Sequence, residues 1–154
     1  MDISQPASLF ELHPSLPLIC DILGKQETCR LFLKGLAGSS ASVIVSTLLK
    51  KQADNFLIIL ADSENAAYFH NDLIHLLDEN RVLFFPSSYK RSVHYELTDP
   101  INITLRTEVL QKILNAGPGD SFTIVTYPEA IAEPVVSQQE LSRNTYKVEK
   151  GEKL

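Results

Sequence analysis

The sequence predicts an α/β fold in which helices flank a parallel sheet. Short apolar runs alternate with longer segments whose apolar residues recur every three or four positions. The run over residues 56–60, FLIIL, is apolar throughout, as expected for a strand whose sheet is covered on both faces. Alternation of such strands with helices favours parallel pairing of the strands.

The first third of the chain is expected to contain a helix, a strand and a second helix. The first helix, over residues 15–23, follows Pro14 and is closed by Gly24. The run Cys29–Leu33, CRLFL, is the first expected strand, and it leads through a glycine-containing loop into a helix over about 42–52. That helix carries its apolar residues on one side, which is typical of a helix packed on a sheet.

The remaining elements are expected at regular intervals. A second strand over 56–60 precedes a helix that Asp62 or Ser63 can cap. A third strand over 81–85 is stopped by Pro86, and a fourth covers 121–126. Between these two strands lie a polar stretch over 87–99 and a helix over 100–115, which has proline at its tolerated first position. We also expect a short helix over 129–136, broken by Pro134, and an extended segment over 144–148.

Composition limits the class of protein. The chain has 154 residues, of which 44% are hydrophobic and 21% are charged, which is typical of a globular domain and not of a disordered or fibrous protein. The net charge of −5 disfavours autonomous binding to nucleic acid. No apolar run has the length of a membrane span, and the first residues do not resemble a signal peptide. Cys20 and Cys29 lack zinc-site spacing, so we expect reduced thiols and a cytoplasmic protein.

The segment Gly35–Ser42, GLAGSSAS, is the most informative motif. It joins an expected strand to an expected helix, where nucleotide phosphates are often held. Compared with the phosphate-loop pattern G-x-x-x-x-G-K-[ST], Gly35 and Ser42 fit, but Ser40 replaces a glycine and Ala41 replaces the lysine that neutralises phosphate charge. The residues of this degenerate loop are Gly35, Gly38, Ser39, Ser40, Ala41 and Ser42. A tight turn without nucleotide, a relic of a phosphate loop and a working nucleotide site are the three interpretations of the loop.

A dinucleotide site is an alternative interpretation of the same region. Asp62 ends the second expected strand, where a dinucleotide fold places its ribose-binding acid. However, Gly35 and Gly38 do not have the G-x-G-x-x-G spacing, so helix capping is the favoured role of Asp62.

The other polar groups give weaker signals. His70 and His75 are five residues apart, which puts them off a common helix face, and we expect them to be solvated or on a helix flank. His13 and His94 have no acidic or cysteine partner nearby in sequence. The basic and aromatic cluster over 87–92, SSYKRS, suggests a solvated loop rather than a phosphate contact. We assign no catalytic residue and no metal ligand.

Four segments in order resemble a known family. They are 32–39 (FLKGLAGS), 56–66 (FLIILADSENA), 83–86 (LFFP) and 124–130 (IVTYPEA). This set is similar to the N-terminal segment of the bacterial transcription-repair coupling factors (Mfd) and to the first helicase-like subdomain of the repair protein UvrB. In UvrB-type sequences the loop contains Gly-Lys-Thr, whereas in the Mfd module it is degenerate, as it is at Ser40, Ala41 and Ser42.

The resemblance implies a RecA/helicase-like subdomain with a degenerate P-loop over residues 1–130. Residues 131–154 would then form a linker and the start of a UvrA-binding domain. The parent protein would be an ATP-dependent DNA translocase that uses ATP and Mg²⁺ in a separate C-terminal core. Its partners would be UvrA, RNA polymerase and duplex DNA, reached mainly through other domains, with no membrane partner. We expect this segment to be a non-catalytic scaffold without a cofactor; an active P-loop NTPase and a dinucleotide-binding enzyme are the alternatives.

Overall fold

A three-stranded parallel sheet forms the centre of the protein. The computed structural model describes residues 12–25, 28–77, 81–89 and 98–144. The strands are β1 (Phe56–Ile59), β2 (Val82–Phe84) and β3 (Thr123–Thr126), and β3 lies between the other two. In register, Phe56 and Val82 both lie opposite Thr123. The expected α/β class with a parallel sheet is therefore confirmed.

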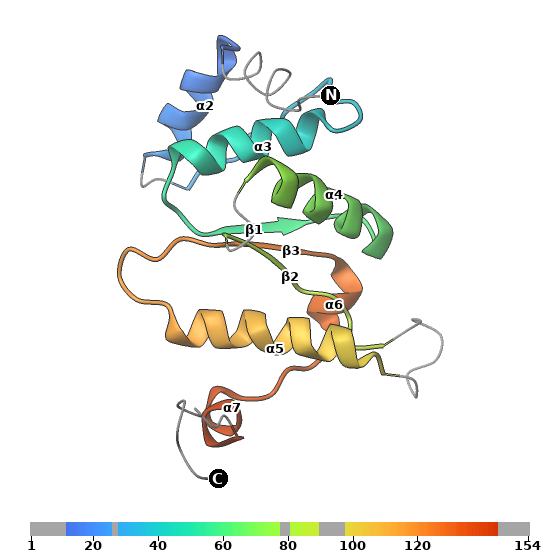
Figure 1. The fold of residues 1–154 in the computed structure, drawn as a ribbon. Coiled ribbons are helices and arrows are strands. Elements are labelled where there is room, and N and C mark those ends of the chain that lie inside the picture. Colours follow the sequence, from blue (N-terminus) through green and yellow to red (C-terminus); the bar gives the residue numbers. More distant parts are fainter. Residues whose placement is uncertain (1–11, 26–27, 78–80, 90–97, 145–154) are drawn as a thin grey trace.

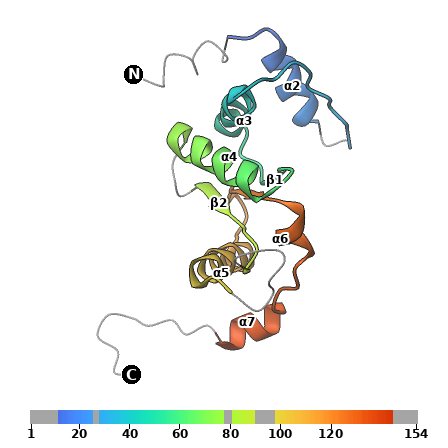
Figure 2. The ribbon, with the colours of Figure 1, turned by 90° about the vertical axis from the view of Figure 1, so that its right-hand side faces the viewer.

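Helices cover both faces of this sheet. Two of them, α3 (Ser40–Lys51) and α4 (Ser63–Leu76), lie on one side, and α5 (Pro100–Asn115) lies on the other (Figure 1). On the first side α4 packs directly against β2 and β3, α3 packs against α4, and α2 (Ser15–Leu23) packs against α3. The turned view shows the same stack, with α2 and α7 (Gln138–Asn144) at opposite ends of the molecule (Figure 2).

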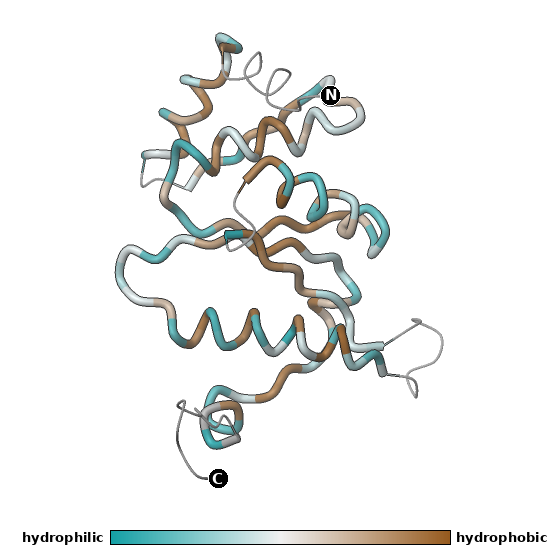
Figure 3. Tube along the Cα trace, in the orientation of Figure 1, coloured by the Kyte–Doolittle hydropathy of each residue, from teal (hydrophilic) through white to brown (hydrophobic). Residues whose placement is uncertain are grey.

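Alternation along the strands divides the core into two clusters. Val82 and Val125 face α4 and join Leu49, Ala66 and Leu73 in the larger cluster. Leu83 and Ile124 face the other side, with Val109 of α5 and Phe122. The strands lie in one of the most hydrophobic parts of the trace (Figure 3). The two faces follow from the period of two in a strand, since neighbouring side chains point to opposite sides.

Local signals account for where the main helices begin. Asp62 accepts a hydrogen bond from the backbone N–H of Asn65 at 2.8 Å and caps α4, as expected. Asp99 caps α5 by accepting from the N–H of Ile101, and Pro100 occupies the first turn, where its missing N–H costs no hydrogen bond. The expected bounds of 15–23 and 100–115 are those of α2 and α5. The helix expected over about 42–52 begins two residues earlier, at Ser40.

The strand expected over Cys29–Leu33 is absent, and that prediction is wrong. Residues 28–37 form no helix or strand, and Phe32 is 87% exposed. An apolar run becomes a strand only when another strand supplies its hydrogen bonds, and no strand in the described part of the chain pairs with these residues. The sheet therefore has three of the four expected strands.

The expectation that both faces of the strand at 56–60 are covered is also wrong. Phe56 and Ile58 pack against the larger core cluster. Leu57 and Ile59, which point to the opposite face, are 60% and 54% exposed. The reason is that α5, the helix on that face, packs mainly against β2.

The chain continues after β3 through two short helices. The first, α6 (Pro128–Ala132), is shorter than the expected 129–136, and α7 was not expected. A reciprocal pair of hydrogen bonds begins α7: Ser137 Oγ accepts from the N–H of Glu140, and the Glu140 carboxylate accepts from the N–H of Ser137. Asn144 belongs to α7, and the rest of the extended segment expected over 144–148 lies outside the described residues. No helix within the described ranges is both long enough and apolar enough to cross a bilayer.

Candidate functional site

The glycine loop before α3 makes the tight turn that its sequence requires. Gly35 and Gly38 have φ angles of +87° and +55°, which side chains other than glycine rarely adopt. Ser40 Oγ accepts a hydrogen bond of 2.7 Å from the N–H of Ala37 and closes the turn. The loop therefore leads directly into α3, and the Ser40 side chain and the Ala37 backbone N–H are bonded to each other within it.

The hydroxyl of Ser42 is directed away from the loop and into the protein. Ser42 is 2% exposed, and its Oγ donates a hydrogen bond of 2.9 Å to Asp72 Oδ2 on α4. In a phosphate loop the hydroxyl at this position binds Mg²⁺. Here it joins α3 to α4, and the neighbouring Ala41 carries no charge that could neutralise phosphate. Both observations favour a structural role for this end of α3.

The loop is on the side of the molecule where the strands end. Figure 1 shows the first residues of α3 on the right, where the arrow of β1 also points. Ligands of parallel α/β sheets usually bind on that side, in loops that directly follow strands. The segment leading into this loop is not a strand, however, so the strand–loop–helix arrangement of a phosphate site is incomplete among the described residues.

Asp62 is occupied as a helix cap. Its carboxylate accepts hydrogen bonds from the N–H and the side-chain amide of Asn65, and these bonds lower the pKa of Asp62 below its ordinary value. A ribose-binding acid would need its oxygens free for the two sugar hydroxyls. The geometry therefore favours the capping role.

The histidines on α4 have different surroundings. His75 is exposed, as expected, and its Nδ1 lies 2.7 Å from the carbonyl oxygen of Asn71. His70 is partly buried on the flank of α4 that faces β2, so of the two expected positions, in solvent or on a helix flank, it has the second. Its ring centroid lies 5.2 Å from that of Phe84, and burial lowers its pKa.

His70 lines a groove of about 690 Å³ between α4 and α5. The groove runs along the outer edge of β2, and its walls mix polar residues with apolar ones: His70, Ile74, Leu105, Glu108, Gln111 and Lys112 are among them. Among the described residues no group of three acidic, histidine or cysteine side chains is placed to hold a metal ion. Cys20 and Cys29 are both free thiols.

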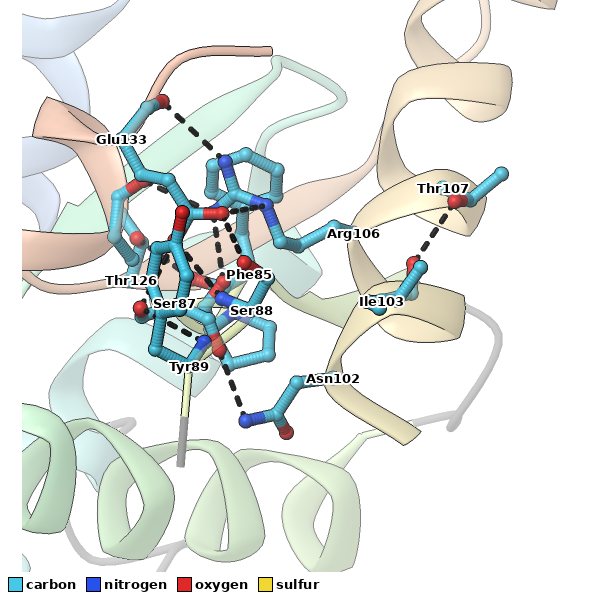
Figure 4. Close-up of polar contacts among 12 residues, drawn as sticks. Phe85, Ser87, Ser88, Tyr89, Asn102, Ile103, Arg106, Thr107, Thr126 and Glu133 are labelled. Atoms are coloured by element: carbon cyan, nitrogen blue, oxygen red, sulfur yellow. Dashed lines mark hydrogen bonds and ion pairs between the residues drawn. The ribbon is translucent and has the colours of Figure 1, made fainter. Parts of the chain in front are cut away.

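The most extensive polar network lies where β2 and β3 end, around Arg106 of α5 (Figure 4). Arg106 is 6% exposed, and its guanidinium lies 4.1 Å from the centre of the Phe85 ring. It donates to the carbonyl oxygens of Pro86 at 2.7 Å and Ala130 at 3.0 Å, and its Nε is 3.5 Å from the Glu133 carboxylate. We call this set, together with Ser87, Ser88 and Tyr127, the Arg106 cluster.

Glu133 ties the start of the 87–99 segment to the cluster. Its carboxylate accepts hydrogen bonds from the hydroxyls of Ser87 and Ser88 and from the N–H of Ser88. Burial alone would raise the pKa of Glu133, but these hydrogen bonds and the charge of Arg106 outweigh burial and lower it. The carboxylate is therefore ionised at neutral pH and serves as an anchor.

The 87–99 segment is held at both ends. The Tyr127 hydroxyl accepts from the N–H of Ser87 at 2.8 Å, and Asn102 of α5 donates to the Ser87 carbonyl oxygen. Tyr89 and Thr98 form an antiparallel bridge. The expectation of a solvated loop over 87–92 is thus wrong for Ser87 and Ser88, while Lys90, Arg91 and Ser92 lie outside the described residues, as does His94.

Sequence reasoning missed Arg106 and Glu133, although one signal was available. Arg106 lies one helical turn from Asn102 and from Val109, on the buried side of α5. A charge in that position usually has a buried partner, because an unpaired buried charge is costly. The partner, Glu133, could not be predicted from the local sequence because it lies 27 residues after Arg106.

The two regions differ in what they can do chemically. The Arg106 cluster is a saturated network, and among described residues no buried side-chain polar atom lacks a hydrogen-bond partner. Such a network holds the segments that it joins in one position. The glycine loop makes a tight turn into α3, and Ala41 supplies no positive charge there. No protein-family model, curated protein or solved structure matches the chain.

Proposed function

We propose that this chain is a non-catalytic scaffold segment of a transcription-repair coupling factor. In this proposal it is a RecA/helicase-like subdomain with a degenerate P-loop. It belongs to a UvrB-like module that recruits UvrA to RNA polymerase stalled at a lesion, in nucleotide excision repair. Three of the four segments that resemble the Mfd family lie on the parallel sheet: 56–66 contains β1, 83–86 contains most of β2, and 124–130 contains most of β3.

The observation that carries the non-catalytic part of the proposal is the pairing of Ser42 with Asp72. The hydroxyl that would bind Mg²⁺ in an active loop is buried in a contact between α3 and α4. Ala41 adds no positive charge beside it. A loop of this kind keeps the turn into the helix and loses the groups that make strong charge-assisted contacts to phosphate.

Both alternative functions receive less support from the same geometry. An active P-loop NTPase needs a cation and a metal-binding hydroxyl at positions 41 and 42. A dinucleotide-binding enzyme that uses Gly35, Gly38 and Asp62 needs a free acid, and the Asp62 oxygens bond to Asn65. We therefore place ATP and Mg²⁺ in a separate translocase core of the parent protein, which would be cytoplasmic and would contact RNA polymerase and duplex DNA through other domains.

Capture of UvrA tests this proposal. In it, residues 131–154 begin the domain that contacts UvrA, and residues 1–130 support that domain. We expect residues 1–154 alone to retain little purified UvrA, and the same chain extended through the following domain of its gene to retain it in equimolar amount. An extended chain that does not retain UvrA would contradict the assignment to this family.

A pair of variants adds a control to the capture experiment. Arg106→Met in the extended chain removes the hydrogen bond to the carbonyl oxygen of Ala130 in α6, whereas Arg143→Met removes an exposed charge. If the subdomain acts as a scaffold, Arg106→Met should weaken UvrA capture and Arg143→Met should not.

A further inference from the structure

The two outer edges of the sheet are not equivalent. At the β2 edge, the ring of His70 lies against Phe84, with 5.2 Å between the ring centroids, so a side chain of α4 covers part of this edge. At the β1 edge, no strand in the described part of the chain pairs with Phe56–Ile59. Unpaired strand edges bind other strands unless they are blocked by charge, proline or a covering element.

The hydrogen bonds of β1 show which of its groups face outward. The N–H of Phe56 donates to the carbonyl oxygen of Phe122, and the N–H of Leu60 donates to that of Thr126. Alternate residues of a parallel strand bond to the same neighbour, so the backbone groups of Leu57 and Ile59 are directed away from β3. These two residues also have the exposed side chains of the strand, at 60% and 54%.

We propose that the β1 edge pairs with the β1 edge of a second copy of this chain, in antiparallel orientation about a two-fold axis at Ile58. In that register Leu57 of one copy lies opposite Ile59 of the other, and each such pair exchanges two backbone hydrogen bonds. Because opposed residues lie on the same face of a sheet, all four exposed aliphatic side chains meet on one side. The result is a continuous six-stranded sheet.

We choose a second copy of this chain as the partner of the β1 edge because this edge is complementary to itself. An isologous interface needs one patch that matches itself under a two-fold rotation. β1 meets this condition because its outward groups are spaced evenly about Ile58 and its four residues, FLII, include no charge and no proline. The patch is also small compared with the interfaces of stable complexes, so the dimer is expected to be weak and to depend on concentration.

The residues that flank β1 predict how salt acts on this dimer. The same register brings Asp54 of one copy nearest to Asp62 of the other, since both positions are four residues from Ile58. Both aspartates are exposed, so their repulsion is screened by salt. Dimerisation should therefore strengthen when the ionic strength rises from about 0.05 M to about 0.5 M, which is opposite to the behaviour of a dimer held by ion pairs.

Sedimentation equilibrium over a range of concentrations tests the proposal. We expect the wild-type chain to dimerise reversibly, and Leu57→Lys to weaken the dimer by about tenfold or more, because it places two like charges at the joined edge. Leu18→Lys is the matched control, since Leu18 is 61% exposed and its helix, α2, lies at one end of the molecule, beyond α3 and α4 (Figure 2). A wild-type chain that stays monomeric, or a dimer equally sensitive to both substitutions, would overturn the proposal.

A cross-linking variant tests the register independently of affinity. In a background with Cys20→Ser and Cys29→Ser, Ile58→Cys puts two thiols at the two-fold axis, where opposed Cα atoms of a non-hydrogen-bonded pair are about 4.5 Å apart. That separation suits a disulfide. We expect mild oxidation to convert this variant to a covalent dimer and to leave Leu18→Cys mainly monomeric. Equal cross-linking of the two variants would contradict pairing through β1.

Discussion

Substituting Arg106 is expected to destabilise the protein more than any loss of a surface charge. Arg106→Met keeps most of the apolar length of the side chain but removes the donors to the carbonyl oxygens of Pro86 and Ala130 and the ion pair with Glu133. Arg106 and Glu133 side chains are only 7% and 11% exposed. Breaking such a pair from one side typically costs about 3–5 kcal/mol, because the remaining groups stay buried without their partner.

Urea denaturation followed by circular dichroism measures this loss of unfolding free energy. In a thermal melt, the same loss of about 3–5 kcal/mol corresponds to a fall in Tm of roughly 6–20 °C for a chain of this size. Arg106→Lys keeps the charge and loses the planar fork, so it should fall between the wild type and Arg106→Met. Arg143→Met on α7 is the control and should change stability by no more than about 0.5 kcal/mol. If Arg106→Met cost no more than Arg143→Met, the reasoning about the Arg106 cluster would be refuted.

Three further predictions concern the loop, α4 and nucleic acid. Gly35→Ala should lower the free energy of unfolding by about 1–2 kcal/mol because φ is +87° at this position, although no atom blocks a Cβ there. Gly117→Ala is the control and should be neutral or slightly stabilising. Thermal melts compare the two variants, and equal effects would contradict the role of the positive φ at Gly35. The pKa of His70 is below its ordinary 6.5, so its neutral form contributes stability above pH 6.5 that is lost as the pH falls below that value. His70→Gln should therefore lose less stability than wild type between pH 7.5 and 5.5, while His75→Gln should follow wild type in the same urea titrations. With a net charge of −5, the chain should bind duplex DNA weakly, and tight, salt-sensitive retention in a gel-shift assay would count against this.

Elements with strong local signals were predictable from sequence. α2 and α5 begin and end where expected because Pro14, Gly24 and Pro100 mark their limits. Asp62 capped its helix as expected, since a cap needs only the residues of the following turn. The reciprocal hydrogen bonds of Ser137 and Glu140 show that the beginning of α7 was also readable, from its S-x-x-E pattern.

The features that sequence reasoning missed depend on contacts between distant parts of the chain. The run at 29–33 has the composition of a strand but no strand partner within the described residues, and composition cannot supply one. The exposed face of β1 depends on where α5 packs, which periodicity does not determine. At the candidate site, the glycine turn was predictable from Gly35 and Gly38, whereas the contact of Ser42 with Asp72 spans 30 residues and was not.

Calorimetric titration of Mg²⁺-ATP into the chain tests the central proposal, that the glycine loop is a degenerate phosphate loop that does not bind nucleotide. We expect no detectable binding at physiological ATP concentration, because Ala41 supplies no cation and the Ser42 hydroxyl donates to Asp72. Ser40→Gly combined with Ala41→Lys restores the sequence pattern and should give at most weak binding and no turnover. Micromolar affinity of the unmodified chain for Mg²⁺-ATP, or sustained hydrolysis by the double variant, would contradict the account and point to an ATPase.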